Sequence, residues 1–377
     1  MTKSSYKIVL LPGDGVGKEV VREGEKILRA VEQKFDLNFE YIKLDGGGEY
    51  YLKTGKEWDD TSFETCKESD AILLGAVGWP GANLPDGNIA GYNIVMGLRF
   101  GLDLYANVRP VKMYKGIKHK ICNEFKTVWQ PGSVDFVIVR ENTEGLYSPI
   151  RGEILRGGVT DVAIDTRVIT RKGAERIIKF AFELARQRNG APKDGKKRVT
   201  CIDKSNLLRG CQFFRKVFDE LAKNYSEIER DYAIVDAFTQ WMVRNPEFYD
   251  VCVTTNMFGD IVTDLASVLQ GGLGMAAGGN IGDNHAMFEP IHGSAPKHAG
   301  KNTVNPMATI LAVQMMLDWL GNKYHDVKLK QSAKVVEMSI AKVLAEGKVL
   351  TYDLGGNSST TDVGTEIVKN ITHATES

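Results

Sequence analysis

The stretch that decides the fold is VCVTTNMFGDIVTDLASVL, residues 251–269. It opens with a short β-branched run, which is typical of a buried strand. A turn around Gly259 follows, and from Ile261 to Leu269 the apolar residues recur as on one face of a helix. The stretch therefore predicts a strand that leads through a short turn into a helix.

The same alternation extends along the 377-residue chain. Buried strands are expected at 6–11, 71–74, 136–139, 199–202, 233–235 and 251–254, and helices at 17–31, 92–99, 172–188, 211–223, 261–269, 306–320 and 329–344. Strands that alternate with helices predict an α/β fold with a largely parallel or mixed sheet. The length suits two domains or one large α/β domain.

The composition restricts the class of protein. The chain is 43% hydrophobic and 25% charged, and Lys+Arg and Asp+Glu are both 48. This balance argues against binding of nucleic acid or anionic membranes through bulk charge. No apolar run approaches the roughly 18 residues of a membrane span, and no secretory signal is recognised at the start. The five cysteines form no CxxC pair, so a reduced, cytoplasmic location is expected.

Two aspartates, Asp260 and Asp264, lie four residues apart on the expected helix and therefore share a face. Carboxylates placed in this way repel each other unless a cation lies between them, and Mg²⁺ or Mn²⁺ prefers such oxygen ligands. Asp236, at the end of another expected strand, is a possible third ligand. The alternative is that Asp260 only caps the helix.

Arg99, Arg109 and Arg140 each follow or end an expected element. The guanidinium group binds carboxylates through a planar fork of donors, which favours recognition of a dicarboxylate. Taken singly, an arginine of this kind is more often a surface or ion-pair residue.

Two loops are rich in glycine or other small residues. The loop 288–300 allows close approach of backbone to a ligand, although an ordinary crossover loop has the same composition. Gly13–Gly17 follows a strand and opens a helix, but Lys18 stands where a dinucleotide fingerprint needs its third glycine. We interpret this second loop as a tight strand-to-helix turn and not as a Rossmann site. The alternative is that its glycines line a cleft.

Four segments resemble the isocitrate/isopropylmalate dehydrogenase family of β-decarboxylating dehydrogenases. They are Leu102–Pro110, Arg140–Tyr147, Asn256–Asp264 and His292–Pro306, and the resemblance extends from Leu11 to Gly356. It implies an isopropylmalate dehydrogenase-like two-domain fold with a mixed parallel and antiparallel sheet, not a Rossmann fold. Residues 1–103 plus 271–377 would form the larger, cofactor-side domain, and residues 104–270 the smaller one.

An arm at about 147–165, punctuated by glycines, is expected to clasp a second copy of the chain. The other reading of this arm is a mobile surface hairpin. The resemblance implies a homodimer with shared active sites, alone or paired into a tetramer.

The resemblance also assigns roles to residues. The catalytic residues of the family match Tyr147 and Lys204, with Lys204 supplied by the other subunit. Its substrate-carboxylate arginines match Arg99, Arg109 and Arg140. Its ligands of Mg²⁺ or Mn²⁺ match Asp260, Asp264 and Asp236, with Asp236 contributed by the other subunit. The expected cofactor-binding residues are His292, Gly293, Ala295, Lys297, His298, Asn305 and Tyr352. All these groups are retained, which disfavours a non-catalytic regulatory subunit.

Fewer residues bear on the choice of substrate and of cofactor. Val95, Met96 and Leu207 would form an apolar wall, which favours a 3-alkylmalate such as 3-isopropylmalate. D-malate or tartrate comes next, and isocitrate or homoisocitrate after them, with Asn93 a possible replacement for a polar group of isocitrate enzymes. Lys297 and Tyr352 favour NADP over NAD, whereas His298 and Gly356 depart from the NADP pattern.

Overall fold

The computed structural model describes residues 3–374. The chain forms two compact units. The first unit contains Met1–Asp103, Met113–Pro131 and Ser267–Ser377, and the second contains Leu104–Lys112 and Gly132–Ala266. Residues 113–131, which the sequence-based division placed in the smaller domain, group with the first unit.

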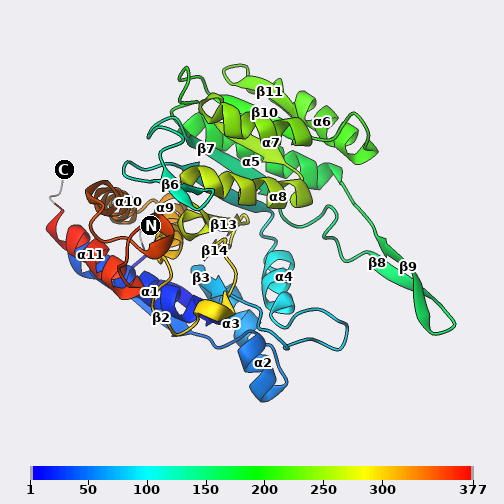
Figure 1. The fold of residues 1–377 in the computed structure, drawn as a ribbon. Coiled ribbons are helices and arrows are strands. Elements are labelled where there is room, and N and C mark those ends of the chain that lie inside the picture. Colours follow the sequence, from blue (N-terminus) through cyan, green and yellow to red (C-terminus); the bar gives the residue numbers. More distant parts are fainter. Residues whose placement is uncertain (1–2, 375–377) are drawn as a thin grey trace. The chain divides into compact units, whose positions relative to one another are not determined.

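The first unit is built on five strands with the order β13-β14-β3-β1-β2. They are β1 (Tyr6–Gly13), β2 (Phe39–Lys43), β3 (Ala71–Ala76), β13 (Ala277–Ile281) and β14 (Ala286–Pro290). β13 and β14 are antiparallel, and the other neighbours are parallel. The helices are α1 (Gly17–Phe35), α2 (Gly48–Thr54), α3 (Ser62–Glu68), α4 (Tyr92–Gly101), α9 (Met307–Tyr324), α10 (Val327–Glu346) and α11 (Thr360–His373) (Figure 1). A small separate hairpin joins β5 (His119–Ile121) and β6 (Glu124–Lys126).

The second unit has the strand order β11-β10-β12-β7-β4. Its strands are β4 (Ala106–Lys112), β7 (Asp135–Glu141), β10 (Arg198–Asp203), β11 (Glu229–Ile234) and β12 (Val251–Thr254). β4 is antiparallel to β7, and the remaining pairs are parallel. Helices α5 (Arg171–Gln187), α6 (Arg209–Ala222), α7 (Val235–Arg244) and α8 (Asn256–Ser267) complete it. The expected mixed α/β architecture is confirmed.

Among the element boundaries that differ from the expectation, two concern site residues. Helix α8 begins at Asn256, so Gly259 is helical and Asp260 lies one turn inside the helix instead of capping it. A Cβ on Gly259 would lie 2.6 Å from the side chain of Arg140, so the glycine serves close packing. Strand β11 ends at Ile234, and Asp236 therefore lies in the first turn of α7.

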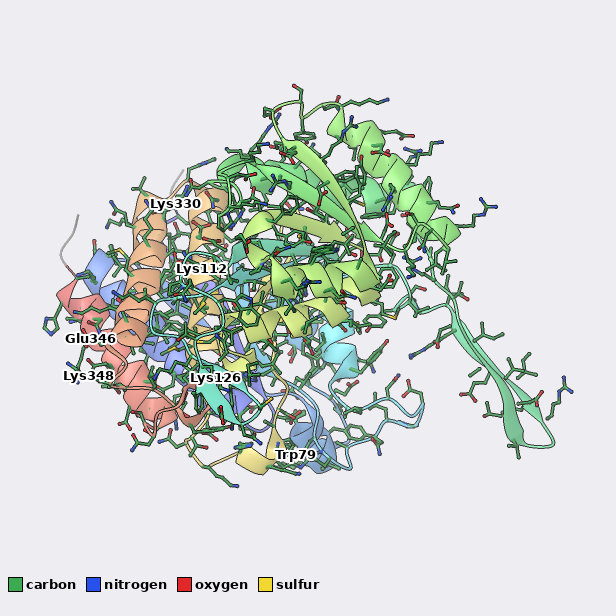
Figure 2. All side chains as sticks on the ribbon, turned by 45° about the horizontal axis from the view of Figure 1, so that its top comes forward. Trp79, Lys112, Lys126, Lys330, Glu346 and Lys348 are labelled. Atoms are coloured by element: carbon green, nitrogen blue, oxygen red, sulfur yellow. The ribbon has the colours of Figure 1, made fainter. Side chains whose placement is uncertain are left out.

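The hairpin of β8 (Arg151–Arg156) and β9 (Val159–Asp165) belongs to the second unit (Figure 1). Its side chains extend into solvent (Figure 2). Every residue of both strands is exposed. Leu155 is 61% exposed and Val159 70%, which is unusual for side chains of this size. No helix in the described residues is long and apolar enough to cross a membrane.

Candidate active site

Three segments of the second unit converge on Asp260. Arg109 on β4 and Arg140 on β7 are 6% and 1% exposed, and the antiparallel pairing of their strands places them close together. Arg140 donates Nη1 to Asp260 Oδ1, and Arg109 Nη2 lies 3.5 Å from the same oxygen. The hydroxyl of Tyr147 donates to Asp260 Oδ2 at 2.9 Å. The sequence placed these side chains on separate elements, and the fold brings them together.

Polar neighbours hold the two guanidinium groups in position. Asn256, the first residue of α8, accepts from Arg140 Nε at 3.1 Å and from Nη2 at 2.7 Å through one amide oxygen. Arg109 donates Nε to Asn107 at 2.8 Å and Nη1 to the hydroxyl of Thr263. No role for Asn256, Asn107 or Thr263 is predicted by the sequence, in which they are marked only by lying near the arginines or the aspartates.

The electrostatics of this cluster are set by partial burial and by the charges of the two aspartates and two arginines. Partial burial raises the pKa of Asp264, and the nearby Asp260 charge raises it further against the opposing effect of Arg109. Burial, followed by the Asp260 charge, also raises the pKa of Tyr147. Tyr147 is therefore protonated at neutral pH and able to donate a proton. The two carboxylates, one helical turn apart, fit the hard oxygen donors that Mg²⁺ or Mn²⁺ requires.

Lys204 and Asp236 form a separate pair. Lys204 follows β10, and its Nζ lies 2.5 Å from Asp236 Oδ1. The hydrogen bond from Lys204 lowers the pKa of Asp236. Within residues 3–374 no group of three or more His, Cys, Asp or Glu side chains is arranged to hold a metal ion. Asp236 therefore does not complete a metal site with Asp260 and Asp264 of its own chain.

The remaining expected substrate residues lie on α4 of the first unit and on the second unit. Val95 and Met96 are half-buried on α4, and Leu207 in the second unit is 71% exposed. Asn93 donates its side-chain amide to Glu57 Oε2 at 2.7 Å. Oε1 of Glu57 also accepts from the backbone of Gly91 at 2.6 Å, where α4 begins. Glu57 therefore holds the start of α4, and this contact was not expected from the sequence because its partners lie 34 and 36 residues away.

A pocket of 240 Å³ in the first unit contains most of the expected cofactor-binding residues. Of these, His292, Ala295, His298, Asn305 and Tyr352 line it, together with Val16, Gly271–Gly274, Val304 and Asp353. Gly293 and Lys297 are outside this lining. The rings of His298 and Tyr352 are parallel to within 6°, with centroids 5.8 Å apart. A small pocket with an aromatic wall and several glycines suits a flat heterocycle.

His292 carries the strongest sign that this pocket takes a ligand. Its Nδ1 lies 3.0 Å from the carbonyl oxygen of Gly293, whereas its buried Nε2 has no hydrogen-bond partner among the described residues. Burial lowers the pKa of this imidazole. An unpaired buried polar atom is costly, and a bound group that pairs with it would remove that cost.

The Gly13–Gly17 turn joins β1 to α1, and its Val16 lines this pocket. Gly13 and Gly15 have positive φ values of 70° and 55°, and a Cβ on Gly15 would lie 2.1 Å from the carbonyl oxygen of Ser294. The buried carboxylate of Asp14 accepts from the backbone of Gly48, Glu49 and Gly78 at 2.7–2.8 Å. The interpretation as a tight turn is confirmed.

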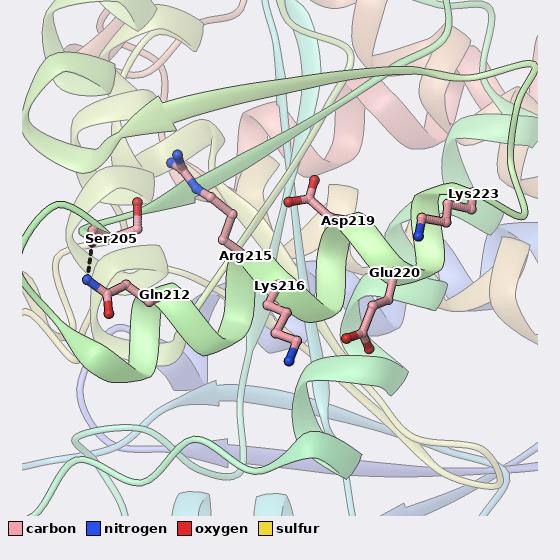
Figure 3. A pocket seen from close by; sticks show the side chains of 7 residues that line it. All are labelled: Ser205, Gln212, Arg215, Lys216, Asp219, Glu220 and Lys223. Carbon is pink, nitrogen blue, oxygen red and sulfur yellow. Dashed lines mark hydrogen bonds between the residues drawn. The ribbon is translucent and has the colours of Figure 1, made fainter.

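A second hollow, of 540 Å³, runs along α6 of the second unit (Figure 3). Its lining residues are Ser205, Gln212, Arg215, Lys216, Asp219, Glu220 and Lys223. Arg215 donates Nε to Oδ2 and Nη2 to Oδ1 of the buried Asp203, at 2.8 and 3.0 Å. Charges of both signs follow one another along the helix, as on a solvated face.

Comparison with known proteins identifies the class to which this fold and site belong. The model of the family described as "Isocitrate/isopropylmalate dehydrogenase" matches residues 7–368. The chain is 42% identical, over 97% of its length and 99% of the relative's, to the "3-isopropylmalate/3-methylmalate dehydrogenase" of Methanocaldococcus jannaschii. It is 43% identical to the "Homoisocitrate dehydrogenase" of the same organism, over 97% of both chains.

A solved structure agrees with these relatives. The crystal structure of isocitrate dehydrogenase from Methylococcus capsulatus matches with a TM-score of 0.85 and 35% identity, over 98% of this chain and 100% of the other. The protein is therefore an α/β decarboxylating dehydrogenase of the NAD(P)-dependent class. It belongs to the isocitrate/isopropylmalate dehydrogenase family, whose members act on small hydroxy acids.

Proposed function

We propose that the protein oxidises and decarboxylates a 3-alkylmalate such as 3-isopropylmalate to a 2-oxo acid and CO₂. The observation that carries this proposal is the convergence of Arg109, Arg140 and Tyr147 on the α8 carboxylate Asp260. The two buried arginines can bind the carboxylates of a substrate. The neighbouring aspartate pair can bind a metal ion, which the substrate hydroxyl needs for its oxidation.

Each group has a task in this reaction. Asp260 and Asp264 would hold Mg²⁺ or Mn²⁺ together with Asp236 from a second copy of the chain. When bound, the cation would supply Lewis-acid chemistry that lowers the pKa of the substrate 2-hydroxyl, and the nicotinamide of NAD(P) would supply the hydride acceptor. Arg99, Arg109 and Arg140 bind the substrate carboxylates. Lys204, also from the second copy, takes the hydroxyl proton, and the protonated Tyr147 supplies a proton to the carbon that loses CO₂.

The wall on α4 supports an alkyl substituent. Val95 and Met96 present apolar surface that gains free energy from burying an alkyl group but leaves an additional carboxylate without a partner. Asn93, the polar residue of this helix that an isocitrate-type substrate would need, already donates its amide to Glu57. D-malate or tartrate is the second candidate, since neither carries a third carboxylate, and isocitrate or homoisocitrate comes third.

For the cofactor we propose that NADP is used at least as well as NAD. Lys297 is exposed next to the pocket residue His298, where an ammonium group would pair with the 2′-phosphate. Tyr352 stacks on His298 in the pocket wall. Asp353 also lines this pocket, but its carboxylate is already bound by Asn305 at 3.0 Å and by Thr351 at 2.5 Å.

We further propose that the working enzyme is a homodimer, alone or paired into a tetramer. Residues 1–103 and 271–377, together with residues 113–131, would form the larger domain. The exposed apolar side chains of the β8–β9 hairpin support a clasp between copies. Within residues 3–374 of one chain, Asp236 does not group with Asp260 and Asp264, which supports a metal site completed by the partner.

The test is a matrix of substrates and cofactors. The purified chain is assayed with Mn²⁺ for kcat/KM on 3-isopropylmalate, D-malate, tartrate, homoisocitrate and isocitrate, each with NAD and NADP. We expect 3-isopropylmalate with NADP to rank first. A tenfold preference for isocitrate would overturn the substrate assignment, and turnover without reduction of either nicotinamide would overturn the reaction class.

A further inference from the structure

A buried ion pair in the first unit joins Arg99 to a residue with no role in the function proposed above. Arg99, in the last turn of α4, donates Nη2 to Glu289 Oε1 at 3.1 Å. The side chains of Arg99 and Glu289 are 9% and 12% exposed. Glu289 lies near the end of β14, immediately before the loop that carries His292.

A third side chain holds the glutamate. Asn280 on the neighbouring strand β13 is fully buried and donates its amide to the same Oε1 of Glu289 at 2.7 Å. The register pairs Gly278 with Glu289 and Asn280 with Met287, so both side chains project from one rigid antiparallel ladder. The carboxylate is consequently a fixed point to which the arginine on α4 is attached.

One nitrogen of the Arg99 guanidinium, Nη2, thereby has a hydrogen-bond acceptor, and another nitrogen has none. Its Nε is buried and has no hydrogen-bond partner among the described residues. A guanidinium that is held through one nitrogen, with a second donor unpaired, is prepared to receive an anionic acceptor. A long arginine side chain otherwise loses conformational entropy when it is immobilised by a ligand.

We propose that Glu289, anchored by Asn280, is a positioning residue that sets the orientation of Arg99 for a substrate carboxylate. This inference rests on the proposed function, in which Arg99 binds substrate. Glu289 itself touches neither substrate nor cofactor in this scheme. Its effect is to fix the guanidinium before binding, so that less of the binding free energy is spent on ordering it.

The experiment is a double-mutant cycle on the full-length protein with Mn²⁺. Glu289→Ala, Arg99→Ala and the double variant are compared for KM, for kcat and, by calorimetry without cofactor, for the Kd of 3-isopropylmalate, or of whichever tested acid the wild type oxidises best. Glu289→Gln retains an acceptor oxygen without the charge. Glu25→Ala is the matched control, because it removes a carboxylate that pairs with Arg29 on α1 at 2.7 Å.

We expect Glu289→Ala to raise KM and Kd about tenfold with kcat within about twofold, the size of one charge-assisted hydrogen bond. The KM and Kd of Glu289→Gln should stay within about threefold of the wild-type values, and those of Glu25→Ala should equal the wild-type values. In the Arg99→Ala background, Glu289→Ala should add less than about twofold, because contacting residues are not additive when one acts through the other.

Three results would overturn the inference: full additivity in the cycle, an unchanged Kd in Glu289→Ala, or tighter substrate binding in Glu289→Gln. The last would show that Glu289 competes for Arg99 instead of orienting it. Failure of the proposed function is a different observation, since it appears in the wild type as absent NAD(P)H formation with every acid tested.

Discussion

Arg140 and Asp260 form a hydrogen-bonded ion pair in which a fully buried arginine, held by Asn256, donates Nη1 to the aspartate Oδ1. The other oxygen of Asp260 accepts from Tyr147. Each oxygen of one carboxylate thus has a different partner from a different segment. Asp260, itself a proposed metal ligand, consequently contacts both a proposed substrate-binding arginine and the proposed proton donor.

The first prediction concerns this carboxylate. Asp260→Asn should lower kcat/KM by about a thousandfold or more, because the loss of an anionic ligand removes several kcal/mol of transition-state stabilisation. Calorimetry with Mn²⁺ should show the same loss of affinity without substrate. Asp60→Asn, which changes an exposed aspartate paired with Lys56, serves as the control for folding and net charge. Retained Mn²⁺ affinity in Asp260→Asn would contradict the metal assignment.

The second prediction concerns the proton donor. Tyr147→Phe should lower kcat about a hundredfold with little change in KM, since it removes a general acid but no carboxylate contact. The raised pKa of Tyr147 implies that this loss is constant from about pH 6 to pH 8, where the hydroxyl remains protonated. Tyr50→Phe removes an exposed hydroxyl bonded to Asp59 at 2.6 Å and should behave as wild type. A KM effect alone would assign Tyr147 to binding.

The third prediction is a pH dependence of stability. Burial lowers the pKa of His292 below its usual 6.5, so the unfolded chain binds a proton there at a higher pH than the folded chain does. The free energy of unfolding should therefore fall as the pH drops below the usual histidine pKa of 6.5. His292→Gln should show a smaller decrease of Tm between pH 7.5 and 5.5 than the wild type. Equal slopes would mean that other groups account for the whole acid effect.

The fourth prediction tests cofactor choice. Lys297→Asp should shift the NADP/NAD ratio of kcat/KM toward NAD by about 10- to 100-fold, because a charge-assisted bond to the 2′-phosphate is replaced by repulsion. Lys301→Asp makes the same charge change four residues away and should leave the ratio nearly constant. If both variants shift it equally, the effect is one of general charge and not of a specific contact.

The fifth prediction tests the hairpin. Replacing Leu155 and Ile164 by Glu places charges on side chains that are 61% and 49% exposed in the single chain. If these residues are covered by a second copy, burying the charges is costly and the dimer dissociates. Light scattering should show a monomer, and activity should fall because Lys204 and Asp236 are no longer supplied. An active dimer in this variant would reject the clasp.

Much of the fold was predictable because its signals are local. The strand β12 and the helices α1, α5 and α9 appear close to their expected positions, since apolar periodicity survives in any context. The start of α8 was wrong by five residues. Gly259 normally indicates a turn, but here its missing Cβ makes room for Arg140, which is 119 residues away in the sequence.

The site divides in the same way. The sequence by itself determined that Asp260 and Asp264 share one helix face, because a four-residue spacing has the same geometry in every helix. Only the tertiary structure decided which groups meet that face, since antiparallel pairing of β4 with β7 brings Arg109 and Arg140 beneath it. It also decided that Glu289 holds Arg99. Such contacts depend on the packing of distant segments, and no local spacing encodes them.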